Sequence, residues 1–156
     1  MMKTLTITKL ALIATATLAA TIALPATAHA DDNGQFQSPS GNIFCLMGVG
    51  NDGEGSLVCQ GGRGFVVGKP PGCDHLAWGD RFSMEQGSAP VSHCHGDTIV
   101  PPYSSPGPNP DVPILDYGQT RSASTITCDS EPSGMTCTDS STGHYFRMSR
   151  ESNELG

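Results

Sequence analysis

Long apolar stretches, basic residues and large aliphatic side chains are all scarce in this sequence. Its one long uncharged apolar run, Leu10–Pro25, has 16 residues, whereas a helix needs about 20 to cross a bilayer. No second run follows, so we expect no membrane span beyond the N-terminal region. The chain has 8 Lys and Arg against 15 Asp and Glu. Because nucleic acids and anionic membranes bind cationic surfaces, neither is an expected partner.

Sequence motifs of common enzymes and metal sites are also absent. The chain contains no Gly-x-Ser-x-Gly elbow, no His-Glu-x-x-His motif and no Cys-x-x-Cys pair. These patterns mark serine hydrolases, zinc peptidases and metal knuckles, respectively. We therefore predict a non-catalytic protein without a cofactor, although a hydrolytic site assembled from dispersed Ser, His and Asp residues stays open.

The N-terminus has the three zones of a secretory signal peptide. Lys3 and Lys9 supply basic charge, the apolar run follows, and Ala28 and Ala30 place small residues at the two positions that a signal peptidase reads. We expect cleavage after Ala30, so that residues 31–156 are secreted to the extracellular space or held in the cell envelope. Loss of the two lysines leaves 6 basic residues against 15 acidic ones, a formal charge of −9.

The cysteines predict how such a chain stays folded. All 6 follow residue 30, in a region where Phe, Ile, Leu and Val make up about one residue in six. An even number of cysteines in an exported chain is typical of disulfides, which compensate for a small apolar core. A metal cluster is the competing interpretation, but it would need closely spaced cysteines.

The spacing of the cysteines predicts which of them pair. Turns at residues 51–53 and 131–134 would each place the two flanking cysteines opposite each other on antiparallel strands, close enough to be bridged. The remaining two cysteines then pair by elimination, although six cysteines allow 15 connectivities in all. The predicted disulfides are Cys45–Cys59, Cys128–Cys137 and Cys73–Cys94.

Glycine and proline, with 19 and 12 residues, interrupt nearly every stretch of the chain. Short β-prone runs between turn residues predict an all-β fold of short antiparallel strands, either a sandwich or a small barrel. We expect a helical turn only near Arg147–Glu154. The expected strands are residues 42–47, 56–60, 64–67, 81–85, 91–95, 122–129, 135–139 and 144–149.

A proline-rich segment divides the exported region. Six of the 13 residues in 101–113 are proline, which is typical of an extended, semi-stiff connector. A proline-rich ligand for a partner domain is the alternative. We thus expect a signal peptide (1–30) and a single exported domain (31–156), with its halves at about 36–100 and 114–150.

The two halves share faint sequence likeness. Pro-Ser-Gly precedes a cysteine at residues 39–41 and again at 132–134, and an aromatic residue followed by Gly precedes one at 78–79 and at 117–118. The halves could be two copies of one β unit, or the likeness could be chance in a glycine-rich chain.

The strongest candidate for a chemical site is formed by His93, His95 and Asp97. On an extended strand these three side chains would project from one face, where two imidazoles and a carboxylate could hold Zn²⁺ or Cu²⁺. The alternative is that they are ordinary polar residues on a solvent-facing strand. No fourth ligand is evident, so we predict no metal site.

Several segments together resemble a known family. They are Ser38–Cys45, Cys94–Thr98, Leu115–Thr120, Ser133–Cys137 and Gly143–Arg150. The set is similar to a family of small exported proteins of mycobacteria and related actinobacteria, whose domain has no known function. This resemblance implies export and an envelope setting, and it implies no catalytic residue.

These observations favour an exported binding or interaction module with a protein or glycan partner. A small secreted hydrolase with a dispersed site is one alternative. A secreted protease inhibitor is another, because loops held by disulfides resist cleavage.

Overall fold

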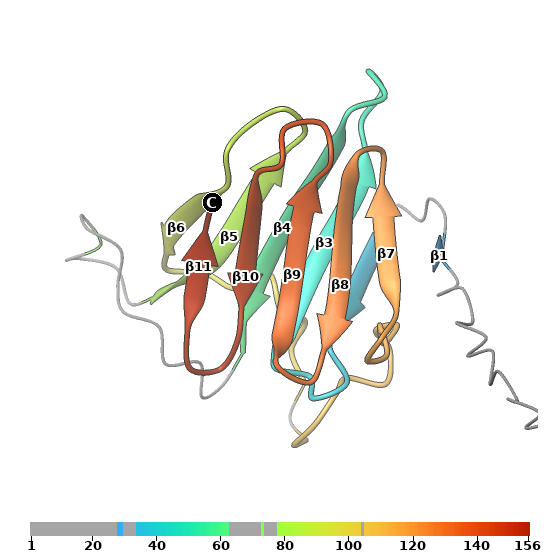
Figure 1. Cartoon of the computed structure of the whole chain (residues 1–156). Coiled ribbons are helices and arrows are strands. Elements are labelled where there is room, and N and C mark those ends of the chain that lie inside the picture. Colours follow the sequence, from blue (N-terminus) through green and yellow to red (C-terminus); the bar gives the residue numbers. More distant parts are fainter. Residues whose placement is uncertain (1–27, 30–33, 63–72, 74–77, 104) are drawn as a thin grey trace, which may run out of the picture.

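Two β-sheets stacked face to face form the fold (Figure 1). A computed structural model describes residues 28–29, 34–62, 73, 78–103 and 105–156, and these residues form no helix and therefore no membrane-spanning helix. The first sheet consists, in spatial order, of β2 (Gly34–Gln37), β3 (Ile43–Val49), β4 (Gly55–Gly61), β5 (Trp78–Glu85) and β6 (Val91–His95). The second consists of β1 (Ala28–His29), β7 (Thr120–Ala123), β8 (Ile126–Glu131), β9 (Gly134–Asp139), β10 (Tyr145–Met148) and β11 (Asn153–Leu155). The predicted all-β sandwich is confirmed, and neither sheet closes into a barrel.

Each sheet is a meander built from one part of the chain. Strands β2 to β6 pair antiparallel in sequence order, and strands β7 to β11 do the same. Among the strands of the described residues, only β1 departs from this pattern, because it pairs parallel with the outer edge of β7. Sequential antiparallel strands need only short hairpin connections, which suits a chain rich in turn residues.

The two meanders repeat one inward-facing row. In the second, third and fourth strands of each meander, two cysteines and a phenylalanine lie side by side across the sheet. The row is Cys45, Cys59 and Phe82 in the first sheet and Cys128, Cys137 and Phe146 in the second. The two phenylalanine rings stack across the interface with 6.0 Å between centroids. The two similar β units expected from the sequence are therefore present.

The motifs that suggested the repeat are not the ones that correspond in space. Residues 39–41 turn from β2 into β3, whereas residues 132–134 lie at the turn from β8 into β9. These positions differ by one strand in the meander. The correspondence instead runs through Phe82-Ser83-Met84 and Phe146-Arg147-Met148, which occupy the same places in the fourth strand of each sheet.

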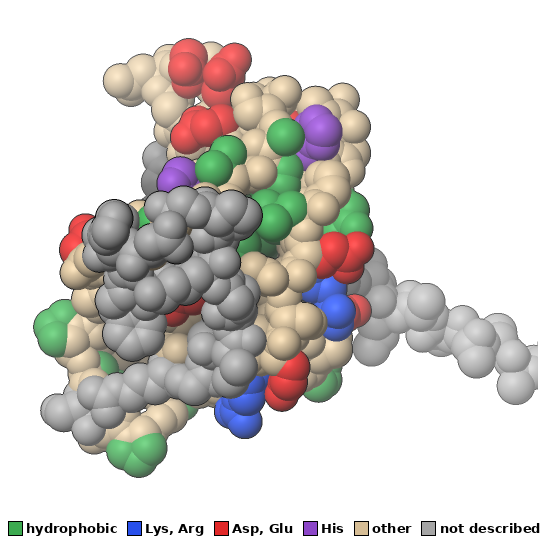
Figure 2. Space-filling view, turned by 90° about the vertical axis from the view of Figure 1, so that its left-hand side faces the viewer, with side chains coloured by type: hydrophobic (Ala, Val, Ile, Leu, Met, Phe, Trp, Pro, Cys, Tyr) green, Lys and Arg blue, Asp and Glu red, His purple; other side chains and the backbone are tan. Residues whose placement is uncertain are grey.

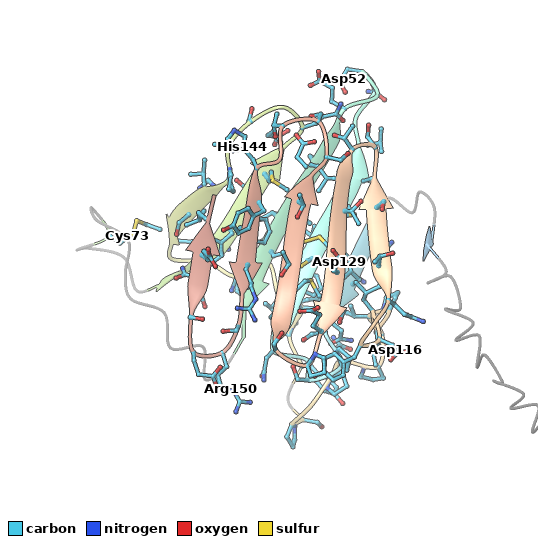
Figure 3. All side chains as sticks on the ribbon, in the orientation of Figure 1. Asp52, Cys73, Asp116, Asp129, His144 and Arg150 are labelled. Carbon is cyan, nitrogen blue, oxygen red and sulfur yellow. A yellow bond between two sulfur atoms is a disulfide. The ribbon has the colours of Figure 1, made fainter. Side chains whose placement is uncertain are left out.

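The core lies between the sheets and contains two of the three disulfides (Figure 3). The structure contains Cys45–Cys59 and Cys128–Cys137, which the hairpin spacing predicts, and Cys73–Cys94, which was assigned by elimination. Cys45 Sγ lies 3.6 Å from Met135 Sδ of the opposite sheet. This is a packing contact, since a disulfide sulfur carries no hydrogen. The bridges thus supply apolar contacts between the sheets as well as covalent links.

Two expectations about local structure are wrong. Residues 122–129 do not form one strand, because a two-residue turn at Ser124 and Thr125 separates β7 from β8 and Ala123 pairs with Ile126. Ser124 adopts a left-handed conformation with φ of 52°, which is uncommon for a residue other than glycine. With no Gly or Pro to mark it, this turn is not visible in the sequence.

The expected helical turn near Arg147–Glu154 is a β-hairpin instead. Strand β11 pairs antiparallel with β10, placing Arg147 opposite Glu154. Burial decides this outcome, because Phe146 and Met148 alternate into the core in the two-residue period of a strand. Strand β2 was also not anticipated, and the expected strand at 64–67 lies outside the described residues.

The buried carboxylate of Asp139 accepts hydrogen bonds from three turns at one end of the sandwich. Asp139, fully buried at the end of β9, accepts hydrogen bonds from the hydroxyl groups of Thr125 and Thr142 at 2.6 and 3.3 Å. Ser141 donates to it through both its backbone N–H and its hydroxyl group. The Gly87 N–H, from the β5–β6 turn of the other sheet, donates at 2.6 Å. Asp139 therefore joins the two sheets through polar contacts.

Candidate functional site

The proline-rich segment that connects the two halves crosses the outer face of the first sheet and is bonded to it. We call residues 97–113 the strap, with Ser104 outside the described residues. The strap contacts one cross-strand row of outward side chains at its members in β2, β4 and β5; the row is formed by residues that pair across β2 to β6. The row consists of Gln37, Phe44, Gln60, Arg81 and His93.

Gln37 anchors the C-terminal end of the strap. Its buried side-chain amide donates to Asn109 O at 2.6 Å and to Val112 O at 2.7 Å, and its Oε1 accepts from Asn109 N at 2.9 Å. Its backbone also bonds to Pro113 O and Leu115 N. Because every hydrogen-bonding group of Gln37 engages the strap or Leu115 just after it, the strap is fixed to the edge of β2.

Gln60 and Arg81 anchor the opposite end. Gln60 donates to Thr98 Oγ1 at 3.0 Å and accepts from Ile99 N at 3.1 Å. Arg81 donates to Gln60 Oε1 and to both the backbone and side chain of Asp97, with its Nη2 3.1 Å from Asp97 Oδ1. The two anchors therefore share hydrogen bonds with each other and with the start of the strap.

Replacing Gln37 with leucine should loosen the strap without removing side-chain volume. The change leaves two carbonyls and one N–H without their partner, and we expect the free energy of unfolding to fall by about 1–3 kcal/mol. Hydrogen exchange should quicken at the amides of Asn109 and Leu115. Gln35→Leu is the matched control, since its side chain lies on the same face without a hydrogen bond to any described residue. Equal effects of the two substitutions would contradict the anchoring role.

Two open hollows lie beside the strap and share a wall. The first, about 400 Å³, lies between the strap and the turn before β3 and includes Asn42 and Phe44 in its lining. The second, about 340 Å³, includes Asp80, His95 and Asp97. Their common wall consists of Gly62, Val100, Pro101 and Tyr103. Volumes of this order suit small-molecule sites. We call the two hollows together the strap groove.

His95 is held by hydrogen bonds at both ring nitrogens. Its Nδ1 lies against the backbone oxygen of Asp97, which can only accept, so Nδ1 carries a proton. Its Nε2 lies 2.6 Å from Asp80 Oδ1. The imidazole, buried in the second hollow, therefore offers no free nitrogen lone pair to a metal or to a substrate proton while Asp80 stays in place.

The three residues considered for metal binding do share one region, as their spacing suggests, but their side chains have different partners. His93 Nε2 lies 2.6 Å from Ser83 Oγ, His95 bonds to Asp80, and the Asp97 carboxylate bonds to Arg81. Within the described ranges no three His, Cys, Asp or Glu side chains are grouped as metal ligands. The three side chains instead take part in hydrogen bonds that connect strands and strap.

His144 lies away from this region. It follows the β9–β10 turn of the second sheet, at the end of the sandwich opposite Arg150 (Figure 3). It lines neither hollow of the strap groove. The histidines of the described chain therefore do not converge on one cleft.

Sequence reasoning missed five residues of the groove and of the strap's anchors, namely Gln37, Gln60, Asp80, Arg81 and Tyr103. Each is a common polar or aromatic residue without a motif around it. Their alignment depends on the strand register, which the sequence does not state directly. The signal that could have found them is the alternation of outward polar residues in strands next to a proline-rich segment.

Comparison with known proteins identifies a family. The chain belongs to the family described as "Family of unknown function (DUF6636)", whose model matches residues 16–155. No curated protein and no solved structure matches the chain. The match agrees with the resemblance to a family whose domain has no known function. It identifies no catalytic residue in this chain.

Proposed function

We propose that this chain is an exported, non-catalytic binding module that holds its ligand in the strap groove. The observation that carries the proposal is that the imidazole of the groove and the guanidinium beside it are both committed to internal bonds. Both nitrogens of His95 and the guanidinium of Arg81 are engaged within the protein, while the Tyr103 ring on the shared wall is 39% exposed. A fixed polar frame beside an open wall suits recognition, and an imidazole with both nitrogens bonded has no free lone pair with which to act as a general base.

Export is supported by the signal-peptide pattern, by the disulfides and by the likeness to exported actinobacterial proteins. Three disulfides and no free cysteine among the described residues suit an oxidising compartment. Expression of the full chain in an actinobacterial host tests this. The secreted protein should begin at Asp31, and its mass should be lower than that of the reduced form by six hydrogen atoms. A full-length chain retained inside the cell would contradict export.

One contact favours the alternative of a hydrolase. Ser83 Oγ and His93 Nε2 are 2.6 Å apart, which is the distance of a nucleophile from its general base. In the described structure, however, His93 Nδ1 has no carboxylate partner to orient the ring, as a catalytic triad would require. The pair more closely matches a cross-strand hydrogen bond.

The Ser83→Ala variant separates these two functions. We expect wild type and variant to hydrolyse p-nitrophenyl acetate at the same rate, equal to that of a matched surface variant such as Ser88→Ala. A decrease of tenfold or more in S83A alone would establish a catalytic dyad and would overturn the non-catalytic proposal.

A further inference from the structure

Two carboxylates of the second hollow each keep one oxygen available. Asp80 Oδ1 is bonded to His95, and Asp97 Oδ1 to Arg81, but neither Oδ2 atom accepts a hydrogen bond from any described residue. The side chain of Asp80 is 13% exposed and that of Asp97 is 78% exposed. A carboxylate oxygen only accepts, so a ligand in this hollow must supply donors.

Charge restricts the ligand further. Asp97 is paired with Arg81, and no Lys or Arg is among the described residues that line either hollow. The chain as a whole has a formal charge of −7. On the face in Figure 2, acidic side chains are spread widely while basic ones occupy small areas. An anionic ligand would therefore be repelled, and the ion pair removes part of the attraction for a cation.

The shared wall offers a surface for stacking. The Tyr103 ring lies between the two hollows, with Pro101 beside it in both linings. An exposed aromatic ring presents a flat apolar face together with a polar edge. The first hollow adds the Asn42 amide, whose side chain makes no hydrogen bond with the described residues. The first hollow therefore offers a donor and an acceptor, and the second offers carboxylate acceptors.

We propose that the ligand of the strap groove is a neutral oligosaccharide. One sugar packs against Tyr103, its hydroxyl groups donate to the free oxygens of Asp80 and Asp97, and the chain continues past the ring toward Asn42. Two hollows on either side of one ring provide two subsites, so an oligomer binds more tightly than its monomer. This inference rests on the proposed function, because it names the ligand class of the same groove.

Titration of the purified secreted protein tests the proposal. The probes are neutral hexasaccharides of β-1,4-glucose, α-1,4-glucose, β-1,4-xylose and β-1,4-mannose, with hexagalacturonate, a chitosan hexamer and a proline-rich peptide as comparison. The measurement is the change in amide NMR shifts together with calorimetric affinity. We expect at least one neutral hexasaccharide to shift the amides of Thr98, Ile99, Val100 and Tyr103, and to bind at least tenfold more tightly than its monosaccharide.

Variants then assign the site. Tyr103→Ala should weaken binding of that hexasaccharide at least tenfold, whereas Tyr103→Phe should keep the affinity within about threefold because the ring remains. Tyr117→Ala is the matched control, since Tyr117 is 46% exposed and lies outside the groove, and its affinity should equal that of the wild type. Thermal melting of each variant confirms that the fold is retained.

The outcomes distinguish this inference from the proposed function. Groove shifts with only the peptide or only a charged hexamer would overturn the saccharide assignment and leave a binding module in place. If no probe shifts the groove amides, both the saccharide assignment and the proposed binding function of the groove would be overturned. Saccharide binding that Tyr103→Ala does not weaken would also overturn the assignment.

Discussion

A variant that lacks both the Cys45–Cys59 and Cys128–Cys137 disulfides is expected to be unfolded at about 37 °C. The bridges close hairpins with sequence separations of 14 and 9, and removing one native disulfide from a small exported domain typically costs about 2–5 kcal/mol. A domain of this kind has only about 5–15 kcal/mol of stability in total. All four cysteines are fully buried in the core, so serine replacements would also bury hydroxyl groups. Circular dichroism of the quadruple serine variant is the measurement.

The third disulfide provides the control. Cys73 and Cys94 lie outside the core cluster between the sheets, so the Cys73→Ser, Cys94→Ser variant should lose less stability and remain folded. If the quadruple variant unfolds cooperatively with a free energy within about 1 kcal/mol of the wild type, the apolar core suffices without the bridges. The role that we assign to the disulfides would then be wrong.

Replacing Asp139 with alanine is expected to lower the free energy of unfolding by about 3–5 kcal/mol. Donors from both sheets would lose their shared acceptor, whose own side chain is fully buried. Urea denaturation measures the change. Asp129→Ala serves as the control because Asp129 lies on the outer face of the second sheet (Figure 3), and its loss should stay within about 1 kcal/mol. Equal losses of stability in the two variants would contradict the proposed role of Asp139 in joining the two sheets.

Lowering the pH should reveal how much the Asp139 carboxylate contributes to stability. Burial by itself raises the pKa of Asp139. The hydrogen bonds from Thr125, Gly87 and Ser141 together lower this pKa by more than burial raises it, so that it lies well below the ordinary value of 3.8. A carboxyl group with a lowered pKa stabilises the fold fully above pH of about 4 and loses this contribution as the pH falls further. The difference in stability between wild type and Asp139→Asn should therefore shrink between pH of about 5 and about 2. A difference that stays constant over this range would refute the assignment.

The sequence predicted the disulfides and the strand-rich fold because both depend on local information. A turn centred on Asp52 sets which residues of β3 and β4 face each other, and Cys45 then lies opposite Cys59. The same argument holds for the hairpin that contains Cys128 and Cys137. Where local signals were absent, as at the turn of Ser124 and Thr125, the expectation failed.

The groove could not be predicted in this way. Gln37, Gln60 and Arg81 are far apart in the sequence and lie in one cross-strand row only because β2 to β5 pair in one particular register. The alternation of His93, His95 and Asp97 predicted that their side chains lie in one region. Their hydrogen-bond partners, Ser83, Asp80 and Arg81, come from another strand. These hydrogen bonds depend on the strand register, which the spacing of the three residues along the chain does not give.

By itself the sequence determined the short strands, the turns between them and the cysteines that those turns bring together, because each depends on neighbours a few residues away. Only the tertiary structure decided that the proline-rich segment lies across the first sheet and that Asp139 joins the two sheets. Both features depend on which strands stand beside one another and which faces turn inward. That choice is made by the collective burial of apolar side chains, a property of the whole domain rather than of any short segment.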